Sequence, residues 1–166
     1  YESGTALAFS ADGQRLACGG QRGEGGRLVL RDAATGKGRR LLEGNDLAVY
    51  AVAFAPDGKT LASAAHDRRI RDKVRLWNVE TGVELHCLEG SRVVAFSPNG
   101  KILATAPKKG SEPIQFWHTA TGEPIGTVPA SDEEYSIQRI VFTPDGKNLA
   151  VGTGFNRVTI VLWDIA

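Results

Sequence analysis

Methionine is absent from this sequence of 166 residues, and cysteine occurs only twice. Because Tyr1 is not a natural translation start, we expect the chain to be an excerpt of a longer protein. Two thiols cannot form a disulfide framework or a four-ligand metal site, so we expect no metal, no cofactor and a reducing, cytoplasmic setting. Cys18 and Cys87 lie in apolar segments, which predicts buried structural thiols.

An excess of charge of either sign is also missing, and so are long apolar runs. The 20 basic and 19 acidic residues leave a formal net charge of +1, which creates no overall field to attract nucleic acid or an anionic membrane surface. No apolar segment approaches the ~20 residues that a transmembrane helix needs. Basic residues interleaved with exposed aromatics, which single-stranded nucleic acids require, are not found in the sequence either. We therefore expect neither a nucleic acid nor a membrane as partner.

The sequence does contain an internal repeat. Four segments superimpose with their phenylalanines at Phe9, Phe54, Phe96 and Phe142, which are 45, 42 and 46 residues apart. Each phenylalanine is followed by a glycine-containing turn, of the Pro-Asp-Gly or Pro-Asn-Gly type in the last three copies, and then by a Leu-Ala pair. A spacing of this length is typical of proteins that are built from tandem structural repeats.

A second landmark follows in step in each repeat. One position is occupied by Trp77, Trp117 and Trp163 in the last three copies and by Arg31 in the first. Two landmarks that recur in the same order and at the same spacing indicate one structural unit per repeat.

Each repeat translates into four short strands. An apolar run that ends in phenylalanine predicts a buried strand, and the proline and glycine after it predict a reverse turn, since proline fixes φ and glycine accepts positive φ. Small residues at 61–65 predict a second strand, the alternating segment 74–79 a third that ends at a Thr-Gly turn, and 82–90 a short fourth. Four antiparallel strands in about 40–45 residues are typical of one β-propeller blade.

With both landmarks in register, the sequence resembles the WD-repeat family over essentially its whole length. The resemblance implies an all-β fold, a β-propeller arc of four four-stranded antiparallel blades in which the last blade lacks its outer strand. The expected domain is a single propeller region over 1–166, with blades at about 5–44, 45–90, 91–130 and 131–166, the last incomplete. The repeated positions expected to form the core are Phe9, Phe54, Phe96, Phe142, Leu16, Leu61, Leu103, Leu149, Trp77, Trp117 and Trp163.

Blades of this family often hold a hydrogen-bonded set of histidine, serine or threonine, aspartate and tryptophan. The corresponding residues of the second blade are Asn45, Ser63, Asp67 and Trp77. At the hydroxyl position the other blades are interpreted as carrying Cys18, Thr105 and Gly152. We expect such a set to stiffen the second blade alone, by roughly 0.5–1.5 kcal/mol. Alternatively, the aspartate of the set only caps a solvated loop.

The loops between the second and third strands of each repeat are the least repetitive segments and are rich in basic residues. In a propeller they lie on the same rim as the loops that join successive blades. The residues of the predicted partner-binding rim are Arg68, Arg69, Arg71, Lys73, Lys108, Lys109 and Tyr135. Such a rim favours an acidic peptide, a phosphate group or an acidic domain. The alternative is a set of solvated loops, because neighbouring acids leave the rim close to neutral.

Patterns that indicate catalysis are not found. The three histidines fall in different repeats without ligand spacing, and no Gly-x-Ser-x-Gly motif is present. The glycine-rich segment 20–27 joins two predicted strands, whereas a phosphate-binding loop joins a strand to a helix. We therefore predict no catalytic, metal-binding or cofactor-binding residues.

The WD-repeat family usually acts as a platform on which other proteins assemble, although one fold hosts many functions. We predict a non-catalytic protein–protein interaction scaffold, a partial propeller within a larger or oligomeric protein that binds a protein or peptide. The alternatives are an enzyme or small-ligand binder acting at the central channel, and a purely architectural spacer. Because both ends of the arc would expose apolar faces, we expect it to be completed by further blades from the same chain or from a second copy. The regular Pro-Asp-Gly turns resemble those of bacterial members of the family.

Overall fold

The computed structural model describes residues 3–22, 25–38, 40–44, 48–65, 72–89, 92–107, 112–130, 137–154 and 159–165. Over these ranges the chain forms strands β1 to β15 and no helix. The strands make four antiparallel sheets, each from strands that follow one another in the chain, which confirms the predicted fold class. Two compact units divide the chain, Tyr1–Gly90 and Ser91–Ala166. The single propeller region over 1–166 stays a prediction.

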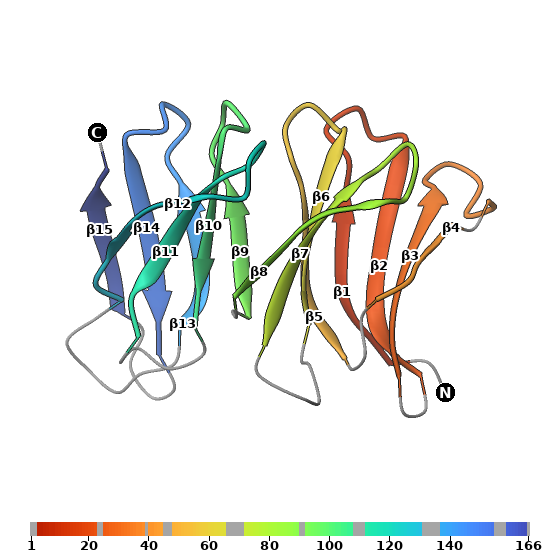
Figure 1. Ribbon diagram of the computed structural model, residues 1–166, viewed down its shortest axis with the longest axis horizontal. Coiled ribbons are helices and arrows are strands. Elements are labelled where there is room, and N and C mark those ends of the chain that lie inside the picture. The colour runs from red at the N-terminus through yellow and green to blue at the C-terminus, as the bar shows by residue number, and fades with distance from the viewer. Residues whose placement is uncertain are drawn as a thin grey trace. The chain divides into compact units, whose positions relative to one another are not determined.

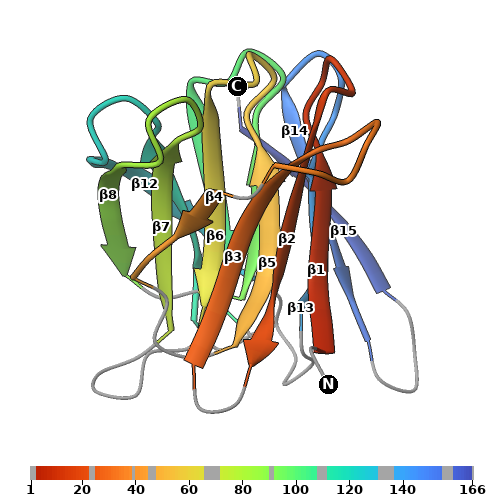
Figure 2. The same cartoon turned by 90° about the vertical axis from the view of Figure 1, so that its right-hand side faces the viewer.

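The first unit contains two four-stranded sheets, which Figure 1 shows in red to orange and in yellow to green. The first sheet consists of β1 (Ser3–Phe9), β2 (Arg15–Arg22), β3 (Gly25–Asp32) and β4 (Arg40–Leu42). The second consists of β5 (Val49–Phe54), β6 (Thr60–Ala65), β7 (Lys73–Asn78) and β8 (Glu84–Glu89). Figure 2 shows β1, β2 and β3 side by side.

The second unit contains one four-stranded and one three-stranded sheet. The first of them consists of β9 (Val93–Phe96), β10 (Ile102–Ala106), β11 (Ile114–His118) and β12 (Pro124–Val128). The other consists of β13 (Ile137–Phe142), β14 (Asn148–Thr153) and β15 (Thr159–Asp164). The last sheet thus lacks a fourth strand in the part of the chain that is described, as the sequence predicted.

The strand register places the second landmark at one position in all four sheets. Across the middle pair of strands, Trp77 pairs with Leu61, and Trp117 and Trp163 each pair with the leucine of their own repeat. Arg31 pairs with Leu16 in the same way, so it occupies the tryptophan position of the first sheet. We call the side of each sheet that carries this position its tryptophan face, and the other side its opposite face.

In the first unit, the tryptophan face of β5–β8 packs on the opposite face of β1–β4. Leu61 and Trp77 from one sheet form a buried cluster with Leu28, Leu30 and Leu42 from the other. Side chains alternate between the two faces of a strand, which explains why residues two apart in β3 share this cluster. The apolar surface removed from water, at about 25 cal/mol per Å², is the main source of stability in such a layer.

The second unit repeats this arrangement. Phe142 and Leu149 of the last sheet form a buried cluster with Ile114 and Phe116 of the sheet before it. The rings of Phe116 and Phe142 lie 6.3 Å apart and are tilted by 57°, an arrangement that aromatic rings favour. The tryptophan face of the later sheet again covers the opposite face of the earlier one.

The core prediction is wrong at Phe9, which is 64% exposed, whereas Phe142 at the same repeat position is 7% exposed. Phe9 lies on the tryptophan face of the first sheet, and no other sheet of its unit packs there. Leu7 and Leu41 share this face and are also exposed. Three exposed apolar side chains occupy the opposite face of the last sheet, namely Val141, Ile160 and Leu162.

The cysteines are placed correctly in strands, but the prediction that they are buried is wrong. Cys18 in β2 is half-buried and Cys87 in β8 is exposed. Cys87 lies on the outermost strand of its sheet, beyond the buried strands β6 and β7, so an apolar sequence context did not lead to burial there.

Hydroxyl side chains close the turn between the first two strands in three of the four sheets. Ser10 donates to Asp12 Oδ1 (2.5 Å) and accepts from the amide of Arg15. Ser97 and Thr143 make the same contacts in their own turns. The hydrogen bonds from the Ser10 hydroxyl and the Gln14 amide hold the pKa of Asp12 below its ordinary value. These turns therefore fix the hairpins locally.

Candidate functional site

Two residues of the predicted hydrogen-bonded set lie in the described part of the chain, and they contact each other. Trp77 Nε1 donates to Ser63 Oγ over 2.8 Å in the buried core. Asn45 and Asp67 lie outside the described residues, so the set as a whole stays a prediction. The third sheet has an equivalent bond of 2.9 Å from Trp117 Nε1 to Thr105 Oγ1. The tryptophan-to-hydroxyl bond is therefore not particular to the second blade.

The register corrects the hydroxyl position of the last sheet. Leu149 pairs with Trp163, so the residue two places further on is Val151, not Gly152. Val151 is fully buried and offers only methyl groups. Trp163 Nε1 is buried and finds no hydrogen-bond partner among the residues that the structure describes. A buried donor without a partner carries a desolvation cost of about 1–3 kcal/mol.

The substitution Val151→Thr is expected to raise the free energy of unfolding by about 0.5–1.5 kcal/mol, because it gives Trp163 Nε1 an acceptor. Threonine already serves this role at the equivalent Thr105. Urea unfolding followed by circular dichroism measures the change. In a Trp163→Phe background the same substitution should instead lower stability, because the new hydroxyl is then buried without its partner. Equal effects in both backgrounds would contradict the assignment.

Most of the predicted rim cannot be placed. The six rim residues outside the described ranges are Arg68, Arg69, Arg71, Lys108, Lys109 and Tyr135. Lys73 is the first residue of β7, where it is half-buried and pairs with Ala65 and Glu89 in the neighbouring strands. The partner-binding rim therefore stays a prediction.

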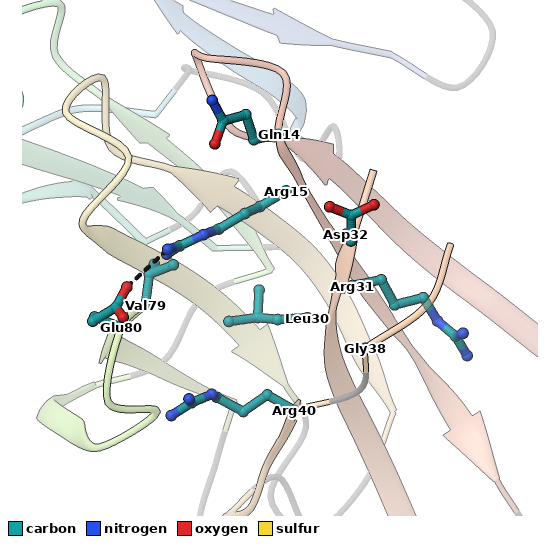
Figure 3. Close-up of a pocket in the computed structure, with 9 residues that line it drawn as sticks. All are labelled: Gln14, Arg15, Leu30, Arg31, Asp32, Gly38, Arg40, Val79 and Glu80. Atoms are coloured by element: carbon teal, nitrogen blue, oxygen red, sulfur yellow. Dashed lines mark hydrogen bonds and ion pairs between the residues drawn. The ribbon is translucent and has the colours of Figure 1, made fainter. Parts of the chain in front are cut away.

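A pocket of about 410 Å³ lies in the first unit, where the turns and strand ends of its two sheets meet (Figure 3). The first sheet contributes most of its lining and the turn after β7 contributes the rest. The lining residues are Gln14, Arg15, Leu30, Arg31, Asp32, Gly38, Arg40, Val79 and Glu80. Three arginines against two acids make this a locally basic pocket with an apolar base.

An ion pair spans the pocket. Arg15 Nη2 donates to Glu80 Oε2 over 2.8 Å, with the two side chains 40% and 79% exposed. The hydrogen bond and charge of Arg15, together with the charge of Arg40, hold the pKa of Glu80 below its ordinary value. One carboxylate thus interacts with two guanidinium groups.

The other charged groups of the pocket are used by the turn after β3. Asp32 Oδ1 accepts from both the amide and the hydroxyl of Thr35, and these bonds hold the pKa of Asp32 below its ordinary value. Arg31 Nη1 donates to the carbonyl oxygen of Gly36, and Figure 3 shows its side chain directed away from Arg15 and Arg40. Arg15, Arg40 and Glu80 therefore define the chemistry of the pocket.

The sequence interpretation did not find this pocket, since its residues come from turns of two different repeats. A signal was nevertheless present: Arg15 stands where the other repeats have Thr60, Ile102 and Asn148. Departures from a repeat are the positions at which one unit can differ in function from the next.

Within the described ranges, no group of three or more His, Cys, Asp or Glu side chains comes close enough to hold a metal ion. Nor do those ranges contain a helix of the length and apolarity needed to cross a bilayer.

Similar solved structures define the class of fold as a β-propeller. A chain of the Kuenenia stuttgartiensis hydrazine synthase matches 98% of this chain with 46% of its own length, at a TM-score of 0.80 and 21% identity. The computationally designed Ika4 protein matches 99% of this chain with 92% of its own length, at a TM-score of 0.76 and 25% identity. The first likeness concerns the fold alone.

Sequence comparison confirms the resemblance to the WD-repeat family. The family described as "WD domain, G-beta repeat" matches residues 36–71. The mouse (Mus musculus) WD repeat-containing protein 90 is 28% identical over 144 residues, and the uncharacterized WD repeat-containing protein sll1491 of Synechocystis is 37% identical over 105. These matches cover 82% and 61% of this chain but 8% and 28% of the relatives. The chain is therefore similar to WD-repeat proteins, and it spans only a small part of the length of the relatives that it matches.

Proposed function

We propose that the chain is a non-catalytic protein–protein interaction scaffold, one part of a larger WD-repeat propeller. Two kinds of observation support this. The family match and the relatives are WD-repeat proteins, and such repeats commonly present rigid surfaces to partner proteins. The alternatives, an enzyme or ligand binder at a central channel and an architectural spacer, gain no support from the comparisons.

The observation that carries the proposal is the pair of exposed apolar faces. Leu7 and Phe9 are 69% and 64% exposed on the tryptophan face of the first sheet, and Ile160 is 72% exposed on the opposite face of the last. Inside each unit, faces of these same two kinds bury each other. Contiguous exposed apolar residues on a protein surface mark interaction sites.

The occupant that best fits these faces is a further WD-type blade. A tryptophan face packs on an opposite face in both units, and exposed apolar side chains lie on the tryptophan face of the first sheet and on the opposite face of the last. We propose that blades from the same longer protein or from a second copy cover them. The short coverage of the relatives supports this, since the matched proteins continue well beyond the aligned segment.

Site-specific photo-cross-linking tests the proposal. Benzoylphenylalanine in place of Phe9 or Ile160 is expected to give adducts with protein segments of WD-type sequence, which mass spectrometry identifies. Val83 provides a matched control, because it is an apolar side chain of 60% exposure in the turn before β8 and lies on neither face. Adducts no more frequent at positions 9 and 160 than at position 83 would refute the scaffold proposal.

A further inference from the structure

We propose that the pocket between the sheets β1–β4 and β5–β8 binds an acidic side chain of a partner peptide. The carboxylate would lie between Arg15 and Arg40, with the neighbouring peptide residues against Leu30 and Val79. This inference rests on the proposed scaffold function and names the chemistry of one partner contact.

The lining combines a buried apolar base with two cationic side chains. Leu30 and Val79 are buried, and Figure 3 shows Arg15 and Arg40 extending on either side of Leu30 toward Glu80. Guanidinium groups bind carboxylates through planar, charge-assisted hydrogen bonds. The pocket can therefore hold a carboxylate and an adjacent aliphatic group at the same time.

Glu80 shows which ligand the arginines accept. Its carboxylate is bound to Arg15 and also lies within the electrostatic influence of Arg40. Because the Glu80 side chain is 79% exposed, its ion pair contributes little to stability. A partner carboxylate can take its place without disturbing the core.

Arg40 supplies the positive charge that is not neutralised. Among the described residues no hydrogen bond or ion pair joins it to an acid, and Asp32 is bonded within its own turn. Gly82 allows the close approach of the Arg40 side chain, since a Cβ at Gly82 would lie 2.9 Å from Arg40 Cδ. Contact along this aliphatic stem limits its freedom and favours binding.

The size and charge of the pocket favour a peptide. A volume of about 410 Å³ exceeds that of one carboxylate, and pockets of roughly 300–1,000 Å³ accommodate ligands of several groups. Gln14 adds an amide at the margin that can bond to a peptide backbone. One surplus positive charge is too little for a polyanion such as nucleic acid.

Fluorescence anisotropy with the 166-residue chain tests the inference. The probe is a fluorescein-labelled peptide of alternating Leu and Asp, and the control peptide has Asn in place of each Asp. We expect Arg40→Gln and Arg15→Gln each to weaken probe binding about tenfold or more. Glu80→Gln is expected to strengthen it, because the substitution frees Arg15 from its internal carboxylate. Lys147→Gln is the matched control, since it removes one exposed charge at the repeat position of Gln14.

Three results would overturn the inference: equal binding of the Asn peptide, unchanged binding by Arg40→Gln, or inorganic phosphate competing at the same concentration as unlabelled Asp peptide. The last would indicate a simple anion site. Circular dichroism establishes that each variant is folded, as expected for exposed positions. If the unaltered chain does not bind the Asp peptide but still forms the cross-links at position 9, the pocket proposal alone is contradicted and the scaffold proposal stays in place.

Discussion

Replacement of Trp77 by alanine is expected to lower the free energy of unfolding by about 3–5 kcal/mol. The side chain is 1% exposed, packs against leucines of the neighbouring sheet, and donates the buried hydrogen bond to Ser63. Its removal leaves a cavity between the sheets and a buried hydroxyl without its donor. Urea unfolding monitored by far-ultraviolet circular dichroism measures the loss.

Arg31→Ala is the control for Trp77→Ala, because Arg31 holds the same repeat position in the first sheet. Its face is not covered by another sheet of the unit, so the expected change is within about 0.5 kcal/mol. If the two variants lose similar amounts of unfolding free energy, the residue at the tryptophan position stabilises its own sheet and not the packing between sheets.

Gly19→Ala is expected to lower the free energy of unfolding by about 1–3 kcal/mol through overpacking. A Cβ at Gly19 would lie 2.6 Å from Val49 Cγ1, 3.0 Å from Val49 Cβ and 3.3 Å from Ala6 Cβ. Valine has no long flexible end that could move aside, so β5 must shift relative to β2. Equilibrium urea unfolding gives the magnitude.

Two further variants make the Gly19 prediction specific. Gly126→Ala, in the exposed strand β12, meets no atom within 4 Å and should leave stability unchanged or slightly raised. Val49→Ala opens space opposite Gly19, so the double variant should lose less stability than the sum of the single variants. Additive losses would show that the close approach of β2 and β5 is not what requires glycine at position 19.

The repeat predicted the strands well because hydrophobic periodicity and turn chemistry act locally. The register joins Trp77, Trp117 and Trp163 to the leucines of their repeats, and the predicted Thr-Gly turn holds Gly36 at a φ of 64°. Burial could not be predicted in this way. Phe9 and Phe142 have the same motif, but only Phe142 faces a neighbouring sheet within its unit.

The candidate site shows the same distinction between local and long-range information. The Ser63–Trp77 contact follows from a pattern within one blade and was expected. The aligned Leu-Ala pairs place the hydroxyl position of the last sheet at Val151, but the prediction from the sequence assigned it to Gly152, one residue further along the chain. The Arg15–Glu80 pair joins residues 65 positions apart, and its formation depends on how one sheet packs on the next. No spacing rule within a repeat encodes such a contact.

The order in which the strands are connected affects how such a chain folds and how it can gain repeats in evolution. Each sheet contains only consecutive strands, so every strand pairing closes a short loop, and closing a short loop costs little conformational entropy. A nascent chain can complete its early sheets before the later ones are synthesised. Because the gain or loss of one repeat leaves the pairing inside every remaining sheet unchanged, tandem duplication can lengthen the array in whole blades without any new pairing rule.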